Sequence, residues 1–96
     1  MLTGKQKRFL RSTAHHLQPI FQVGKGGVND NMIKQIKEAL EARELIKISI
    51  LQNCEEDRET VGNALSAGAN AELVQIIGNT IILYKESQDN KQLELP

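Results

Sequence analysis

The sequence predicts a single α/β domain in which a mixed four-stranded sheet is packed with three helices. The chain has 96 residues, of which 40% are hydrophobic and 25% charged, as is typical of one compact domain. Helical and strand-like apolar patterns follow in the order helix, strand, helix, strand, helix, strand, strand. Strand–helix–strand units favour parallel pairing, whereas two strands joined by a two-residue turn must be antiparallel. The predicted sheet is therefore mixed.

The first helix is predicted to begin at Thr3 and to end before Pro19. Thr3 and Gln6 fit a capping box, in which each side chain satisfies the other residue's backbone N–H. Leu10 and Ala14 recur at helical spacing and are expected to face the core. Pro19 ends the helix because the residue before a proline avoids helical backbone angles.

Two strands and a second helix follow. Residues 19–23 form a short apolar strand, and residues 45–51 form a strand whose isoleucines alternate onto one face. Asn29 is a suitable N-cap for the helix between them. On that helix Ile36 and Leu40 are expected to be buried. Four of its charged residues are expected to stay in solvent: Lys34, Lys37, Glu38 and Glu41.

The third helix is predicted from an acidic start and a glycine near its end. Asn53 with Glu56 resembles a capping arrangement. The acidic run 55–57 suits a helix N-terminus, where the macrodipole favours negative charge. Gly68 is expected to lie just beyond the last helical residue.

A β-hairpin and a polar tail complete the predicted order. Residues 72–77 and 80–84 are strands, and Gly78-Asn79 between them fits a two-residue type II′ turn. Residues 87–96 are polar and are expected to fray.

The net charge is zero, but the charges are unevenly distributed. Residues 1–48 contain nine Lys or Arg and four Asp or Glu, whereas residues 49–96 contain three and eight. This distribution predicts a basic working surface and an acidic back. Chance clustering on solvated faces is the alternative.

The segment Gly24-Lys25-Gly26-Gly27 lies between a predicted strand and a predicted helix start. Glycines allow left-handed backbone angles and close approach of a ligand, and the free N–H groups of a helix N-terminus suit phosphate. A Gly-x-x-Gly loop clamps a single-stranded backbone in KH domains. The spacing fits neither a P-loop nor a dinucleotide site. We interpret the segment as a phosphate-binding loop; a tight connection without a ligand is the alternative.

Basic residues lie on both sides of this loop. Those on the first helix fall on one stripe at about 100° per residue. The candidate RNA-binding residues are Gly24, Lys25, Gly26, Gly27, Lys7, Arg8, Arg11, His15, Lys34 and Lys37. Long basic side chains hold phosphates and read little sequence, so we expect recognition of backbone and shape.

No catalytic or metal site is expected. His15 and His16 diverge by about 100° on a helix, and Cys54 fits no zinc-site spacing. Without a nucleophile–base set or a Walker motif, we expect neither an enzyme nor a cofactor. Arg58 is expected to form local ion pairs with the acids around it. Lys47 either lines an exposed sheet face or protects an edge strand, and we favour a structural role.

Several spaced motifs resemble a known family, the bacterial stand-alone CRM domains of the YhbY type (chloroplast RNA splicing and ribosome maturation). The resemblance covers residues 3 to about 85, nearly the whole chain. Its motifs are Leu10-Arg11 with Ala14-His15 and Leu17-x-Pro19, Val23 to Gly27, Glu44 to Ile48, and Gln75 to Lys85. Several motifs in the right order are more specific than the loop alone.

The resemblance implies a fold similar to the C-terminal domain of a bacterial translation initiation factor, and RNA contact by the loop 24–27. Residues 1–86 are then a CRM-type RNA-binding domain and residues 87–96 a polar C-terminal tail. The implied partner is ribosomal RNA or a large-subunit precursor, whose assembly the protein assists. No membrane or small-molecule partner is expected, and the protein is expected to be a monomer.

Two further expectations concern location and an alternative function. The single cysteine, the absence of an apolar run of about 20 residues and the lack of a secretory signal fit a cytoplasmic protein. The alternative function is a protein-interaction module that binds a ribosomal or assembly protein through the acidic third helix.

Overall fold

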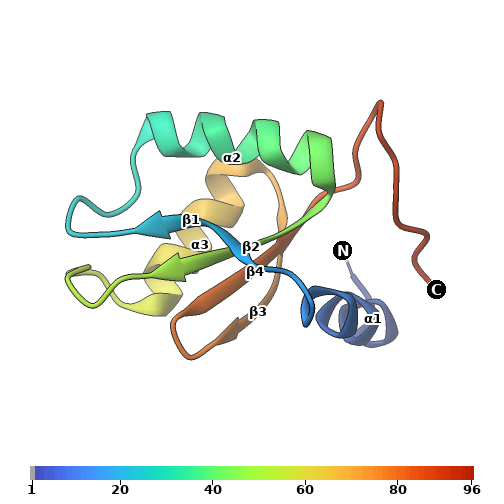
Figure 1. Ribbon diagram of the computed structural model, residues 1–96, viewed down its shortest axis with the longest axis horizontal. Helices are drawn as coiled ribbons and strands as arrows, with labels where there is room; N and C mark the ends of the chain where they lie inside the picture. The colour runs from blue at the N-terminus through green and yellow to red at the C-terminus, as the bar shows by residue number, and fades with distance from the viewer. Residues whose placement is uncertain (1) are drawn as a thin grey trace.

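The computed structural model describes residues 2–96 and contains the predicted elements in the predicted order (Figure 1). They are α1 Gly4–Ala14, β1 Pro19–Val23, α2 Asp30–Arg43, β2 Leu45–Ile50, α3 Arg58–Ala69, β3 Glu72–Ile77 and β4 Thr80–Tyr84. Two predicted caps are confirmed. Thr3 and Gln6 form the capping box of α1, and the Asn29 side chain accepts the Met32 N–H at 2.9 Å at the start of α2.

The four strands form one mixed sheet in the order β1-β2-β4-β3. β1 and β2 are parallel, and β4 is antiparallel to both β2 and β3. β2 and β3 therefore run in the same direction with β4 between them. In the hairpin turn Gly78 has a φ of 55° and Asn79 has no positive φ, as a type II′ turn requires.

Helices cover the two faces of the sheet unequally (Figure 1). α2 and α3 pack on one face, which we call the closed face, and α1 packs on part of the other, which we call the open face. The core under α2 and α3 comprises Val23, Ile36, Leu40, Ile46, Ile48, Ile50, Val61, Leu65, Ala69, Ile81 and Leu83. The smaller core under α1 comprises Leu10, Ala14, Leu45, Val74, Ile82 and Tyr84.

α3 begins later than predicted. Its N-cap is Asp57, whose side chain accepts the Thr60 N–H at 2.7 Å. Asn53 and Glu56 therefore do not form the predicted cap and lie in the loop before the helix. The acidic run therefore precedes α3, because its last residue, Asp57, is the cap; aspartate and asparagine are equally good N-caps, so the local pattern does not distinguish Asp57 from Asn53.

α3 also continues past Gly68, which was expected to lie beyond the helix end. Its C-cap is Asn70, which has a left-handed φ of 54°. A Cβ at position 68 would lie 2.7 Å from Ile33 Cδ1 of α2. Gly68 therefore allows α2 and α3 to pack closely, and this packing outweighs the low helix propensity of glycine.

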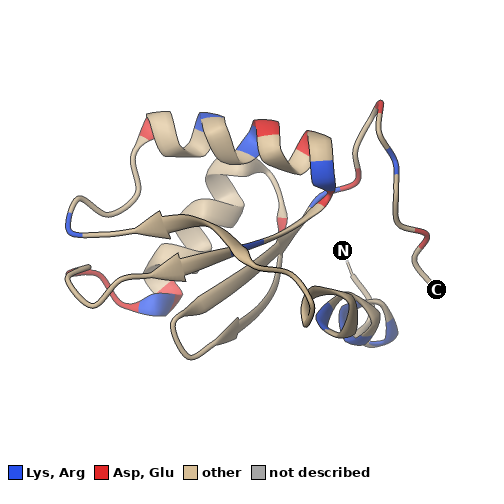
Figure 2. Ribbon diagram, viewed as in Figure 1, with Lys and Arg blue, Asp and Glu red and all other residues tan. Residues whose placement is uncertain are grey.

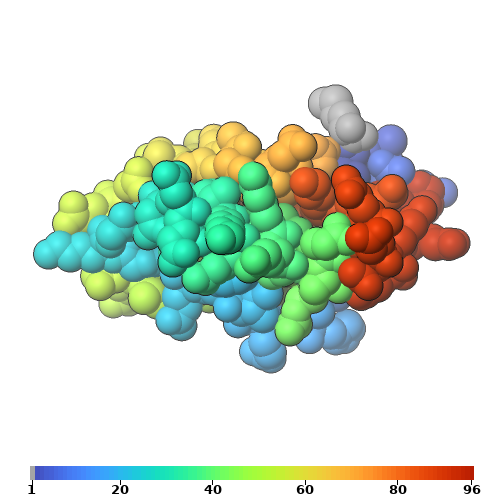
Figure 3. Space-filling view, turned by 90° about the horizontal axis from the view of Figure 1, so that it is seen from above, coloured from blue at the N-terminus to red at the C-terminus, as the bar shows by residue number. Residues whose placement is uncertain are grey.

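Residues 87–96 are attached to the domain, so the expected fraying is wrong (Figure 3). The buried carboxylate of Glu44 accepts the N–H groups of Ser87, Gln92 and Leu93 at 2.8, 2.6 and 2.7 Å. Glu41, which was expected to stay in solvent, accepts the Ser87 hydroxyl at 2.8 Å. Leu93 also packs against the core under α1.

Hydrogen bonds keep both carboxylates ionised. Burial raises the pKa of Glu44, but the three backbone N–H bonds and Lys91 lower it more, so its pKa lies below the ordinary value. The backbone N–H of Gln88 and the hydroxyl of Ser87 lower the pKa of Glu41. Two negative charges therefore hold the tail at neutral pH.

Candidate nucleic-acid interface

The open face presents two rows of side chains between α1 and the loops that follow β1 and β2. The strand register aligns Gln22, Ser49, Thr80 and Ile77 in one row across all four strands. The neighbouring row holds Pro19, Lys47, Ile82 and Gln75. The next row includes Leu45 and Tyr84 and lies under α1. The part of this face that α1 leaves uncovered therefore presents the polar side chains of Gln22, Ser49 and Thr80 together with exposed Ile77.

A hollow of about 240 Å³ lies where α1 meets the β3–β4 hairpin. We call it the α1 groove; it is lined by Arg11, His15, Lys47, Ile77, Thr80 and Ile82. Its basic groups come from the end of α1 and from the centre of the sheet, and none of its lining residues is acidic. Cationic nitrogens beside a hydroxyl and aliphatic surface suit a phosphate with an adjoining base.

The predicted basic stripe on α1 divides between this groove and the outer surface. Arg11 and His15 line the groove, whereas Lys7 and Arg8 lie outside it. Residues 4–14 contain no Asp or Glu, and the charged side of α1 is entirely basic (Figure 2). α1 is therefore a strongly positive border of the open face.

The loop 24–27 lies at the opposite end of the molecule from α1 (Figure 1). The Gly27 N–H donates to the Gly24 carbonyl at 3.0 Å, and Gly27 has a φ of 67°, which favours glycine. Lys25 and Gly26 are exposed, and a Cβ on Gly26 would meet nothing within 4 Å. The loop therefore offers an open backbone turn and one mobile charge.

The loop 24–27 precedes the start of α2 and does not form it. The helix begins at Asp30, after the Asn29 cap. The cap side chain already satisfies one free N–H of the helix, and Asp30 adds a negative charge to its first turn. The N-terminus of α2 is thus less suited to phosphate than the sequence indicated, because its charge and one donor are already compensated.

Acidic residues lie beside the loop, so the predicted division into a basic surface and an acidic back is wrong (Figure 2). A Cβ on Gly27 would lie 2.5 Å from Glu56 Oε1, and one on Gly24 would lie 3.5 Å from Asn53 Oδ1. The loops after β1 and β2 are neighbours at one end of the molecule (Figure 3). The Glu56 carboxylate reduces the attraction of this end for phosphate, which leaves α1 as the more positive region.

Lys34 and Lys37 lie on a different surface from α1. Both are exposed on α2, which covers the closed face, whereas α1 lies on the open face. The structure therefore does not bring them together with Arg11 and His15. An RNA that contacts both sets must pass around an edge of the sheet.

Lys47 is the site residue that the sequence interpretation undervalued. β2 lies between β1 and β4, so Lys47 does not protect an edge strand. Its side chain is half-buried in the α1 groove, and no ion pair among residues 2–96 involves it. The sequence signal is the alternation of Lys47 and Ser49 with isoleucines, which marks one face of a central strand as polar.

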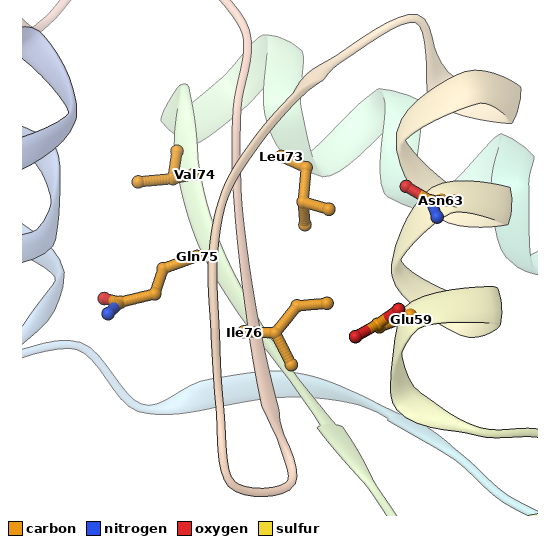
Figure 4. Close-up of a pocket in the computed structure, with 6 residues that line it drawn as sticks. All are labelled: Glu59, Asn63, Leu73, Val74, Gln75 and Ile76. Carbon is orange, nitrogen blue, oxygen red and sulfur yellow. The ribbon is translucent and has the colours of Figure 1, made fainter. Parts of the chain in front are cut away.

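β3 directs neighbouring side chains to both faces of the sheet (Figure 4). A bulge between Leu73 and Gln75 lets Val74 and Gln75 point toward α1, whereas Leu73 and Ile76 point toward α3. Within the described chain, Gln75 Oε1 is buried without a hydrogen-bond partner. The hollow drawn in Figure 4 includes Glu59 of α3 and is separate from the α1 groove.

Arg58 joins α3 to the β3–β4 hairpin, and the expected local ion pairs are absent among residues 2–96. Its Nη1 donates to the Gly78 carbonyl oxygen at 2.8 Å. The Ile50 N–H donates to the Asn79 carbonyl at 2.7 Å. These two bonds fix the hairpin turn beside the groove residues Ile77 and Thr80.

The two adjacent histidines contact each other edge to face, with ring centroids 5.4 Å apart. In the part of the chain that the structure describes, no group of three His, Cys, Asp or Glu side chains is placed to hold a metal ion. None of the helices within residues 2–96 is long and apolar enough to cross a membrane.

Comparison with known proteins gives consistent matches over the whole chain. Residues 2–85 match the CRS1 / YhbY (CRM) domain family. The probable RNA-binding protein YqeI of Bacillus subtilis is 78% identical over 96 residues, which are 100% of both chains. An RNA-binding protein of Haemophilus influenzae is 36% identical over 99% of this chain and 95% of its own. The solution structure of the hypothetical protein SAV1595 from Staphylococcus aureus has a TM-score of 0.83 at 58% identity, with both chains fully covered.

Proposed function

Because the chain belongs to the CRS1 / YhbY (CRM) domain family, we propose that it binds ribosomal precursor RNA and assists assembly of the large ribosomal subunit in the cytoplasm. The observation that supports this most is the α1 groove, where basic groups from α1 and from the central strand β2 meet without an acid among the lining residues. In this proposal the protein is a binding protein and not an enzyme.

The proposed contacts are the loop 24–27 and the basic residues of α1: Lys7, Arg8, Arg11 and His15. These two regions lie at opposite ends of the open face, and β1 runs from one toward the other. Its five residues extend over roughly 16 Å. A single RNA strand laid along the open face therefore reaches both regions, with polar side chains such as Ser49 beneath it.

A pair of double variants tests the RNA contact. Arg11→Glu with Lys25→Glu reverses two charges at the two ends of the open face. The matched control, Lys34→Glu with Lys37→Glu, makes the same change of charge on α2, over the closed face. We expect the first variant to weaken binding to large-subunit precursor RNA more than about tenfold at about 0.15 M salt, and to lower the salt dependence.

Circular dichroism of both variants checks that each is folded. The control is expected to bind within about threefold of the wild type, because nonspecific charge effects on α2 are screened over about 8 Å at this salt. Wild-type affinity of the Arg11 and Lys25 variant would overturn the proposed contact surface.

Sedimentation of cell extract tests the role in assembly. We expect the protein to travel with immature large subunits and to leave that fraction at high salt, as phosphate-dominated binding requires. A protein that stays at the top of the gradient, while the same extract contains immature subunits, would contradict this role.

The alternative of a protein-interaction module loses part of its basis, because the acidic run precedes α3. Its partner would be a basic ribosomal or assembly protein. Charge reversal at Glu55 and Glu56 distinguishes the two functions: RNA binding is expected to be retained or strengthened, whereas a protein partner would be lost. Loss of association with subunit precursors only in this acidic variant would favour the alternative.

A further inference from the structure

We propose that the α1 groove seats one nucleotide of single-stranded RNA, with its base against Ile77 and its phosphate between Arg11 and Lys47. This inference rests on the proposed function, because it names the part of the RNA that the open face would recognise. The proposed function describes the open face by its basic residues, and this inference adds a specific binding site for an unpaired nucleotide.

The size of the groove indicates that it holds part of a polymer. At about 240 Å³ it is smaller than the roughly 300 Å³ at which pockets for whole small molecules begin. Its lining residue Thr80 stands in one row with Ser49 and Gln22, so a chain seated in it can continue across the sheet toward β1. One nucleotide within a single RNA strand fits both the small volume of the groove and its continuation onto the sheet.

Aliphatic surface is exposed where a base would lie. Ile77 is 53% exposed in the groove wall, although large aliphatic side chains are usually buried. Among residues 2–96 the other exposed large aliphatic side chains are Ile20 and Leu51. Ile20 lies on the outer strand β1 beside α1, and Leu51 contacts the position of a Cβ on Gly24. Ile77 and Leu51 thus lie beside the two proposed RNA contacts, whereas Ile20 lines a separate hollow with Arg43 and Ile46.

The charged groups of the groove select a phosphodiester. Arg11 and Lys47 approach it from different elements, and neither has an ion-pair partner among residues 2–96. Lys47 is half-buried on a central strand and lines the groove. A phosphate in the groove would give the Lys47 ammonium group charge-assisted hydrogen bonds, which offset the hydration that it loses by partial burial.

A single strand fits this site better than a duplex. In A-form RNA the bases are stacked and paired, so only a flexible unpaired nucleotide can place its base against Ile77. The hydroxyl of Thr80 and the polar row beside it can bond to sugar or phosphate oxygens. His15 is the one aromatic side chain among its lining residues, and the aliphatic surface of Ile77 offers no hydrogen bond to a base edge, so we expect tolerance of base identity.

The test measures the affinity of the full chain for a mixed-sequence single-stranded RNA of about ten nucleotides and for the same sequence annealed into a duplex. Ile77→Ser is expected to weaken single-strand binding about fivefold, with little change in its salt dependence and little change in duplex binding. Ile20→Ser is the matched control, because it removes an exposed aliphatic side chain that lies outside the groove, in a separate hollow.

Lys47→Met tests the phosphate contact while keeping the length of the side chain. It is expected to weaken single-strand binding about threefold to tenfold and to lower the salt slope by about one, whereas Lys47→Arg restores both. Methyl spectra of the wild type with the single strand are expected to show shifts for Ile77 and Ile82 and none for Ile36, which is buried under α2.

The outcomes separate this inference from the proposed function. If Ile77→Ser and Lys47→Met bind the single strand like the wild type while the Arg11 and Lys25 variant is weakened, the groove site is wrong and the RNA-binding function stands. If the wild type binds neither RNA, both are wrong. If the Ile77 methyl shifts with a glutamate-rich peptide and not with RNA, the groove binds protein and the inference is overturned.

Discussion

The two faces of the sheet differ in what covers them and in what they can do. On the closed face, α2 and α3 bury an uninterrupted layer of aliphatic side chains, including Ile46, Ile48 and Ile50 of β2. On the open face the same strand presents Lys47 and Ser49, and α1 covers only one end. One strand thus stabilises the fold through one face and leaves the other available for a ligand. Substitutions on the closed face should therefore lower the stability of the fold, whereas substitutions on the uncovered part of the open face should change it little.

The largest expected effect is on the closed face. Ile48→Ala leaves a cavity between the sheet and two helices and is expected to lower the free energy of unfolding by about 3 kcal/mol. Urea denaturation measures this change. A loss below about 1 kcal/mol would show that the closed face is not tightly packed, and the contrast between the faces would fail.

The next effect concerns the tail that completes the core under α1. Glu44→Gln replaces a carboxylate that accepts three backbone N–H groups, and its amide group would face donors. We expect a loss of about 2 kcal/mol in the free energy of unfolding. We also expect loss of hydrogen-exchange protection at Gln92 and Leu93. Unchanged protection at these two amides would mean that Glu44 does not hold the tail.

The same contacts predict a dependence on acid. The pKa of Glu44 and that of Glu41 are lowered in the folded protein, so their ionised forms stabilise it above the ordinary value of 4.5. This contribution is lost as the pH falls through the lowered pKa values. We expect amide signals of residues 87–93 to shift below pH 4.5 before those of the core under α2, as an NMR titration would show. If the amide signals of residues 87–93 and those of the core under α2 changed at the same pH, the tail would not be released separately from the domain.

A smaller effect is expected between the two helices of the closed face. Gly68→Ala raises helix propensity by about 1 kcal/mol but places a Cβ 2.7 Å from Ile33 Cδ1. Overpacking of this kind costs about 1–3 kcal/mol, so we expect a net loss of about 1 kcal/mol. Gly68→Ala with Ile33→Val relieves the contact and should recover stability in thermal unfolding. Additive losses in the double variant would contradict the packing explanation for Gly68.

The smallest effect on stability is expected on the open face. Ser49→Ala is expected to change the free energy of unfolding by less than about 0.5 kcal/mol, because its side chain lies outside both cores. Chemical denaturation beside Ile48→Ala gives a direct comparison of neighbouring residues on one strand. A loss above about 1 kcal/mol at Ser49 would show that the open face is structurally constrained.

The order of elements could be predicted because it depends on local signals. Apolar spacing, the caps at Thr3 and Asn29, and the Gly78 turn act over a few residues and appear in the sequence directly. The start of α3 was misplaced because several residues before it can cap a helix, and the local pattern does not choose between them. Gly68 was misinterpreted because the reason for it is Ile33, on another helix.

The tail and the site depend on contacts between distant segments. Glu44 bonds to residues more than forty positions away, so its role is not visible in the local sequence. Loop 24–27 and α1 were both identified as candidates. The distance between them and the approach of Glu56 to Gly27 follow from how the loops pack, which the local sequence does not show. Lys47 could have been ranked higher from its alternation with isoleucines, once β2 is placed at the centre of the sheet.

The central claim is that RNA lies on the open face between α1 and loop 24–27. The most direct test is an NMR titration of the full chain with single-stranded precursor RNA. We predict that amide signals of Gln22, Ser49 and Thr80 shift together with those of Lys25, while those of Lys34 and Lys37 stay in place. Shifts confined to α2, or spread equally over both faces, would contradict the account.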